Sequence, residues 1–285
     1  MPGLDAVAAR QADLSITADA LKRKVERARN AVLILSIAGA LAAAVAAATD
    51  LGEQPRIYVT SAGAALLAIA AALTQRYLGG DAVRRPVRIR AASEALKREA
   101  HLYAAGAGTY ADAAERDESL AARLGAVNVE IADLIPLVRR NPDLGRSPRG
   151  SLDRKQYVDG RIKAQIGFYR SRAERYARIS GKLHFAEWLL ALAAAVITGL
   201  AGVFGRAEFD LAALTAVLTT IGGALLAHLQ ALKYDDLIIA YSAAAQQLEQ
   251  LDASLRDADD VASIAQRAEA IIAEETGSWR AMFLR

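Results

Sequence analysis

The chain has 285 residues, of which 54% are apolar and 6% aromatic, and it contains no cysteine. The apolar share exceeds the roughly 45–50% typical of soluble domains, which speaks against a disordered chain and against an ordinary cytosolic enzyme. Without cysteine there is no disulfide scaffold, thiolate metal site or cysteine nucleophile, and three histidines leave little material for a zinc centre. We therefore expect no catalytic residues, no metal and no cofactor.

Four long runs of the chain contain no charged residue. They have 19, 19, 18 and 22 residues and cover residues 31–49, 57–75, 188–205 and 211–232. Runs of about 18 or more uncharged apolar residues are long enough to span a bilayer. A soluble helical bundle is the alternative, but four such runs would demand an unusually large soluble core. The runs predict an all-α integral membrane protein with four transmembrane helices.

The four runs form two pairs with short connections. The connection over residues 50–56 has seven residues and that over 206–210 has five, so each pair is predicted to be a helical hairpin. Basic residues gather outside the hairpins, before residues 31 and 188 and after residue 75. Because positive residues that flank membrane helices favour the cytoplasm, we expect a multi-pass protein of the inner membrane with both termini cytoplasmic.

The same plan of basic helix, hairpin and long cytoplasmic helix occurs in both halves of the chain. A stretch with two prolines and two glycines separates the halves and is predicted to be a linker. The predicted domains are an N-terminal cytoplasmic helix (1–30), a first hairpin (31–80), cytoplasmic helices (81–140), the linker (141–151) and a C-terminal domain (152–285) with the second hairpin (188–232) and a C-terminal cytoplasmic helix.

Apolar residues recur with heptad spacing on both sides of the second hairpin. Residues 149–187 contain ten basic and four acidic residues, whereas residues 233–285 contain five basic and ten acidic ones. The two segments are therefore predicted to pair as antiparallel helices of opposite charge, either within one chain or between copies. The two seams consist of Ile162, Ile166, Tyr169, Ala173, Tyr176 and Leu183, and of Leu237, Tyr241, Ala244, Leu248, Leu251, Leu255 and Ala258.

The helix before the second hairpin also has a distinctive set of polar and aromatic residues, which are Arg161, Gln165, Phe168, Tyr169 and Arg172. This set, followed by a two-helix hairpin and by an acidic stretch with Trp279, resembles the SLATT family. Phe168 stands where that family usually has tryptophan. The similarity covers residues 152–285, and residues 15–125 share only the layout, as a divergent second copy would.

The resemblance implies a membrane effector of prokaryotic antiviral or conflict systems. Such an effector is expected to be a homo-oligomer that forms a pore or otherwise permeabilises the inner membrane when a partner system produces a nucleotide signal. Its partners would be the lipid bilayer and that signalling system, and we expect no nucleic-acid partner. The residues themselves leave an alternative open, a non-conducting membrane scaffold or signalling module that recruits partners through its cytoplasmic helices.

The fourth uncharged run contains a row of residues spaced four apart that ends in an ionisable group. Ala212, Ala216 and Ala224 are small residues of the kind that lets membrane helices approach closely. Thr220 and His228 share the row and are candidates for a pore or gate, because ionisable residues inside a membrane are functional candidates by default. Close packing and a gate both remain open for this row.

Residues at the predicted membrane edge are candidates for contact with lipid. Arg84, Arg85 and Arg88 follow the second run, and Trp188 opens the third. Polybasic clusters favour anionic lipids, and tryptophan favours the membrane interface. A nucleotide pocket would also use arginines, but the sequence contains no glycine-rich phosphate loop.

Overall fold

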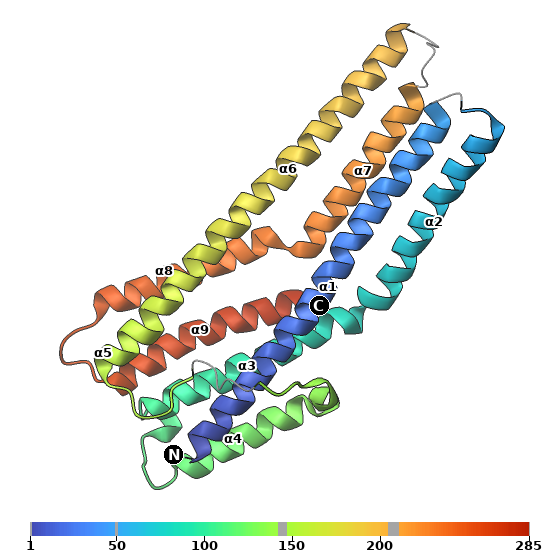
Figure 1. The fold of residues 1–285 in the computed structure, drawn as a ribbon. Coiled ribbons are helices and arrows are strands. Elements are labelled where there is room, and N and C mark those ends of the chain that lie inside the picture. The colour runs from blue at the N-terminus through green and yellow to red at the C-terminus, as the bar shows by residue number, and fades with distance from the viewer. Residues whose placement is uncertain (1, 49–50, 142–146, 205–210, 285) are drawn as a thin grey trace. The chain divides into compact units, whose positions relative to one another are not determined.

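The structure is a computed structural model that describes residues 2–48, 51–141, 147–204 and 211–284, and in that part of the chain it contains helices and no strand (Figure 1). The helices of the first half are α1 (Pro2–Ala48), α2 (Glu53–Tyr77), α3 (Gly80–Ala104) and α4 (Arg116–Glu130), with short 3₁₀ turns at Gly108–Tyr110 and Ala132–Leu137. Those of the second half are α5 (Arg154–Tyr157), a π-helical segment (Val158–Lys163), α6 (Ala164–Phe204), α7 (Leu211–Leu232), α8 (Tyr234–Ser254) and α9 (Val261–Leu284).

Both halves have the same order of helices. A long helix (α1 or α6) is followed by a returning helix (α2 or α7) and then by two further helices. Four helical stretches of the described residues are long and apolar enough to cross a membrane, and each overlaps one of the four uncharged runs. The prediction of an all-α membrane protein with two transmembrane hairpins is therefore confirmed. The second connection, residues 206–210, lies outside the described residues.

The chain divides into two compact units, and each takes segments from both halves. We call residues 24–79 and 175–235 the apolar unit, because they contain the four uncharged runs. We call residues 1–23, 80–174 and 236–285 the polar unit. The units thus do not follow the boundary at the linker.

In the apolar unit, α1 and α2 approach closely at two glycines. A Cβ atom added to Gly39 would lie 2.8 Å from the Cγ of Leu67 and 3.1 Å from the carbonyl oxygen of Gly63. A Cβ added to Gly63 would lie 3.1 Å from the Cβ of Ala42. The contact at Gly39 is shorter than real Cβ atoms make and that at Gly63 is tighter than most, so both positions favour glycine, in the way that small residues allow membrane helices to pack.

In the apolar unit, α7 and α6 differ in how much of their surface the rest of the chain covers. Ala40 and Ala44 of α1 form a small buried cluster with Val217 of α7. In contrast, the most apolar stretch of α6 has no buried residue. Its large exposed side chains are Phe185, Trp188, Leu189, Leu192, Val196 and Leu200. Such a surface needs lipid or another protein to cover it.

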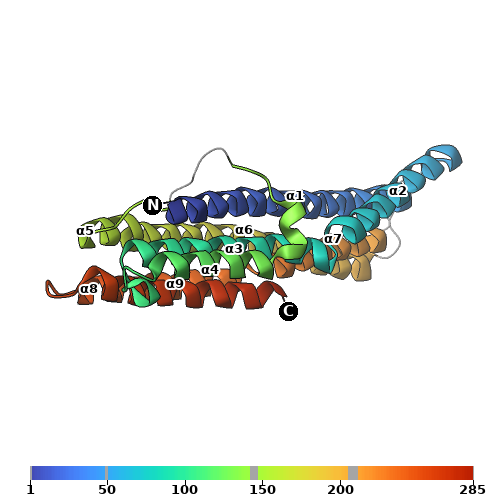
Figure 2. The same cartoon turned by 90° about the horizontal axis from the view of Figure 1, so that it is seen from below.

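The polar unit has a larger core. Leu4, Val7 and Leu14 of α1 are buried in one cluster with residues of α3, α4, α8 and α9. α3 contacts both α4 and α9, and the ribbon shows these three helices side by side (Figure 2). Thus the third helix of the first half packs against the last helix of the second half.

The prediction of a single C-terminal helix is wrong, because this segment forms two helices. The second seam was expected to continue through Ala258, but α8 ends at Ser254 and α9 begins at Val261. Asp259 accepts a hydrogen bond from the backbone N–H of Arg256 at 3.0 Å, and Asp260 accepts one from that of Ser263 at 2.8 Å. Asp260 thus caps the N-terminus of α9, whose first backbone N–H groups have no partner within the helix, and α9 runs back within the polar unit.

The described residues on both sides of 142–146 are attached to α1. The backbone N–H of Asn141 donates to the Asp13 carboxylate at 2.6 Å, and Ser147 donates to the Gln11 side chain at 3.2 Å. Ser147 is buried. The predicted linker is therefore bound to the first helix of the chain at Asn141 and Ser147.

Candidate functional site

The most highly organised polar cluster of the described chain lies at the start of the second half, inside the polar unit. Asp153 caps this helical segment, since its carboxylate accepts from the backbone N–H of Gln156 at 2.8 Å and the Gln156 side chain accepts from the backbone N–H of Asp153 at 3.0 Å. The segment then widens into a π-helix over Val158–Lys163 before α6 begins. Short π-helical segments often occur at functional sites because they redirect a side chain.

Arg161 is the charged side chain of this segment that is buried in the core. Its Nε donates to Oε1 of Glu269 on α9 at 2.7 Å, and its Nη2 donates to Oε2 at 2.9 Å. The hydroxyl of Tyr157 donates to the same Oε1 at 3.1 Å. Arg161 is 4% exposed and Glu269 is fully buried, so this is a bidentate ion pair withdrawn from water.

The electrostatics of this pair depend on both partners. Burial alone would lower the pKa of Arg161, but the charge of Glu269 and the hydrogen bonds to it raise that pKa above the ordinary value. Burial, and then the Glu269 carboxylate, also raise the pKa of Tyr157, which stays a neutral donor. A buried pair adds little net stability over apolar residues, but removal of one partner leaves an uncompensated charge.

A histidine lies beside this pair on α3. His101 is buried, its Nδ1 donates to the carbonyl oxygen of Lys97 at 2.7 Å, and its ring meets Tyr157 edge to face at 6.4 Å between centroids. Burial, followed by the charge of Arg161, lowers the pKa of His101 well below its ordinary value. His101 is therefore neutral at physiological pH and has a structural role in this cluster.

The remaining motif residues continue along α6. Tyr169 stacks on Tyr241 of α8 with centroids 5.6 Å apart, and Phe168 meets both rings edge to face. Arg172 lies over the Phe168 ring at 5.3 Å, and Gln165 hydrogen-bonds to Tyr169. Four of the five motif residues predicted from sequence thus contact one another along α6 and reach Tyr241 of α8, while Arg161 binds Glu269 of α9 separately.

Glu275 on α9 completes this set. The Tyr169 hydroxyl donates to its Oε2 at 3.2 Å. Burial, together with the nearby charge of Glu94, raises the pKa of Glu275 to about 7, although the hydrogen bond from Tyr169 and the charge of Arg90 oppose this. Glu275 therefore changes charge near neutral pH.

The comparison with known families agrees with this geometry. Residues 157–279 match the family described as the SMODS and SLOG-associating 2TM effector domain, SLATT_1. The matched segment begins at Tyr157 and ends at Trp279, so it contains the motif residues, the second hairpin, the buried Glu269 and the partly buried Glu275. The SLATT family predicted from the sequence is confirmed.

The first half has a separate match. Residues 12–118 match a family described as a protein of unknown function, DUF4231. This match is consistent with a divergent N-terminal copy. The comparisons with curated proteins and with solved structures gave no match.

The predicted pore or gate residues lie in the apolar unit, on a face of α7 that the chain itself leaves largely open. Thr220 is exposed and donates to the carbonyl oxygen of Ala216, one turn earlier, at 2.8 Å. Ala216 is also exposed, whereas Ala224 and His228 are partly buried. The side chain of Ala212 lies outside the described residues. The face of α7 that contacts α1 is instead formed by Val217 and its neighbours.

Of the residues predicted to contact lipid, one is hydrogen-bonded within the chain and the others are exposed. Arg88 makes two hydrogen bonds to Asp133, at 2.7 and 2.8 Å, and a third to the carbonyl oxygen of Glu130 at 2.9 Å. Arg84 and Arg85 are exposed. In the apolar unit, Trp188 is 57% exposed and stacks on Phe185 at 5.9 Å. Arg88 thus has a structural role that its position in the sequence did not reveal.

Sequence reasoning identified Arg161 but not its partner. Glu269 lies in a segment with ten acidic residues, and nothing in that composition distinguishes the buried carboxylates from the solvated ones. Gly39 and Gly63 were also overlooked, although each is the single glycine of its uncharged run. One glycine in each of two neighbouring apolar runs is a pattern from which a close approach of the two helices could have been predicted. Among the described residues, no group of three or more side chains is arranged to hold a metal ion.

Proposed function

We propose that this chain is an oligomeric effector that permeabilises the inner membrane in a prokaryotic antiviral or conflict system, in response to a nucleotide signal made by a partner. The observation that supports this most is the match of residues 157–279 to a two-transmembrane effector domain. The proposal assigns no catalytic step to the chain. It also places both termini and the polar unit in the cytoplasm, since the basic residues flank the hairpins on that side.

Two features of the apolar unit support permeation. The surface of α6 is uncovered, and the open face of α7 carries Ala216 and Thr220. Small and hydroxyl side chains on an open face suit contact between copies or with water. We propose that copies of the chain associate through the apolar unit and that Thr220 and His228 face the resulting pore.

The test is release of dye from liposomes. Purified chain is reconstituted at increasing protein-to-lipid ratios into vesicles that contain a small and a large fluorescent dye. A pore releases the small dye first and with a cooperative dependence on protein. Release no greater than from empty vesicles at every ratio would overturn the proposal. The His228→Leu variant should still incorporate and assemble but release dye at a different rate, and an unchanged rate would remove His228 from the pore.

A non-conducting scaffold is the second candidate, and one observation favours it. The polar unit exposes Val129, Ile135 and Leu137, with exposed fractions of 76%, 42% and 38%. Apolar side chains at an open surface suit recruitment of another protein. This function predicts no dye release from liposomes. It also predicts that a Val129→Ser variant loses binding to its protein partner. If the chain is instead a permeabilising effector, the same substitution should leave its toxicity unchanged.

A further inference from the structure

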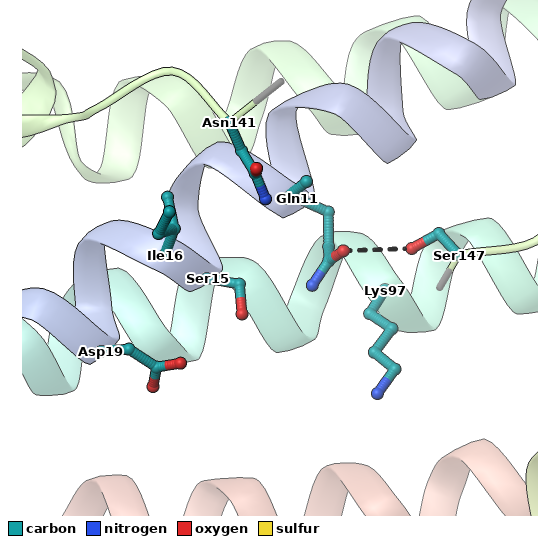
Figure 3. A pocket seen from close by; sticks show the side chains of 8 residues that line it. Gln11, Ser15, Ile16, Asp19, Lys97, Asn141 and Ser147 are labelled. Carbon is teal, nitrogen blue, oxygen red and sulfur yellow. Dashed lines mark hydrogen bonds between the residues drawn. The ribbon is translucent and has the colours of Figure 1, made fainter. Parts of the chain in front are cut away.

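A cavity of about 340 Å³ lies in the polar unit. Such a volume is at the lower end of the range for small-molecule sites. Its polar lining consists of Gln11, Ser15 and Asp19 of α1, Lys97 of α3, and Asn141 and Ser147. Gln11, Ser15, Asp19 and Lys97 project into the same space (Figure 3).

Lys97 is the unusual member of this lining. Within the described part of the chain, its ammonium forms neither a hydrogen bond nor an ion pair. Burial lowers the pKa of Lys97, the charge of Glu94 opposes this, and the positive charges of Arg161 and Arg90 lower it further while the charge of Glu269 raises it. A partly buried ammonium without a partner is costly, which is a reason to look for a bound anion.

The other polar groups of the lining have defined roles. The Gln11 amide donates to Ser93 at 3.1 Å and its carbonyl accepts from Ser147 at 3.2 Å, so Gln11 is fixed in place. Asp19 lies 3.9 Å from Arg90, which is bound more closely to Glu94 at 2.6 Å. The Asp19 carboxylate therefore retains the capacity to accept a hydrogen bond from a ligand.

The chemistry of the lining limits the ligand. The Lys97 ammonium can bind an anionic group, and at a separate point the Asp19 carboxylate can accept a hydrogen bond from a hydroxyl. The residues that line the described cavity include no aromatic ring on which a base could stack. We propose that this cavity binds a compact hydroxylated anion, with its phosphate or carboxylate on Lys97 and a hydroxyl on Asp19. The site does not depend on whether the chain conducts.

The experiment is calorimetric titration of the detergent-solubilised full chain with glycerol 3-phosphate, glycerate and inorganic phosphate. At least one of the two hydroxylated anions should bind saturably at millimolar concentration or below, and the better of them identifies the anionic group. Lys97→Met should weaken that binding at least tenfold. Lys155→Met, which changes an exposed lysine of the same unit, should leave it unchanged. Asp19→Asn should weaken the hydroxylated anion more than inorganic phosphate.

A second measurement separates a binding role from a structural one. If Lys97 serves a ligand, Lys97→Met should leave the unfolding temperature of the ligand-free chain unchanged or higher, because it removes an unpaired ammonium. Three results would overturn the proposal: no saturable binding of either hydroxylated anion, equal binding by wild type and Lys97→Met, or a lower unfolding temperature of Lys97→Met without ligand.

Discussion

The polar unit and the apolar unit are stabilised by different kinds of contact. In the polar unit, long side chains make directional bonds in a buried core, as Arg161 does with Glu269. In the apolar unit, α1 and α2 approach closely at two glycines, Gly39 and Gly63, and much of the surface of α6 is uncovered. Directional buried bonds define one arrangement, whereas small-residue contacts are not directional and depend on close fit alone. We infer that a conformational change of the chain would rearrange the helices of the apolar unit more than those of the polar unit.

The largest effect is expected from removing one partner of the buried pair. Glu269→Ala leaves the Arg161 guanidinium buried without its anion, which costs about 3–5 kcal/mol. The polar unit should then unfold at a much lower temperature, as measured by circular dichroism and limited proteolysis in detergent. Glu274→Ala, an exposed acidic neighbour on the same helix, is the control. Equal stability of the two variants would show that the pair does not organise this unit.

The second effect concerns Glu275 and pH. Its pKa is raised from 4.5 to about 7 in the folded chain, so the folded state binds more protons than the unfolded state between these values. Stability should therefore fall as pH rises from about 4.5 to 7 and then level off, a change on the order of 2 kcal/mol from this group. Thermal unfolding across this range should show a shallower slope for Glu275→Gln. A slope identical to wild type would place the titration elsewhere.

The apolar unit should respond to size rather than to charge. Gly39→Leu inserts a side chain where even a Cβ would lie 2.8 Å from Leu67, and such overpacking costs about 1–3 kcal/mol. Heat-induced aggregation in detergent should begin at a lower temperature, while the proteolysis pattern of the polar unit is retained. At Gly199 of α6 an added Cβ has no neighbour within 4 Å, so Gly199→Leu is the matched control. Similar behaviour of both variants would contradict the close approach.

The smallest effect is expected among the arginines of α3. Arg88→Ala removes the bonds to Asp133 and should lower the unfolding temperature slightly, because exposed ion pairs contribute little. Arg84→Ala and Arg85→Ala should leave that temperature unchanged but weaken binding to vesicles with anionic lipid. Vesicle flotation measures the second property. The division of roles is wrong if Arg88→Ala weakens lipid binding as much as the other two.

The four membrane helices could be predicted from sequence because an uncharged run of bilayer length has few other uses. The motif residues could be identified as a set, but their contacts could not, since Glu269 and Glu275 become special only through burial by distant segments. The break between α8 and α9 was missed because the heptad pattern continues across residues 255–258. There, aspartates that bind backbone N–H groups determine the local structure more strongly than the apolar spacing.

Permeation through the open face of α7 can be tested directly, because the natural chain has no cysteine. Dye release is measured from liposomes containing the Thr220→Cys variant, before and after a membrane-impermeant thiol reagent, with Val217→Cys on the covered face as control. The account predicts that the reagent stops release by Thr220→Cys and leaves release by Val217→Cys unchanged. Release by Thr220→Cys that continues undiminished after the reagent would contradict it.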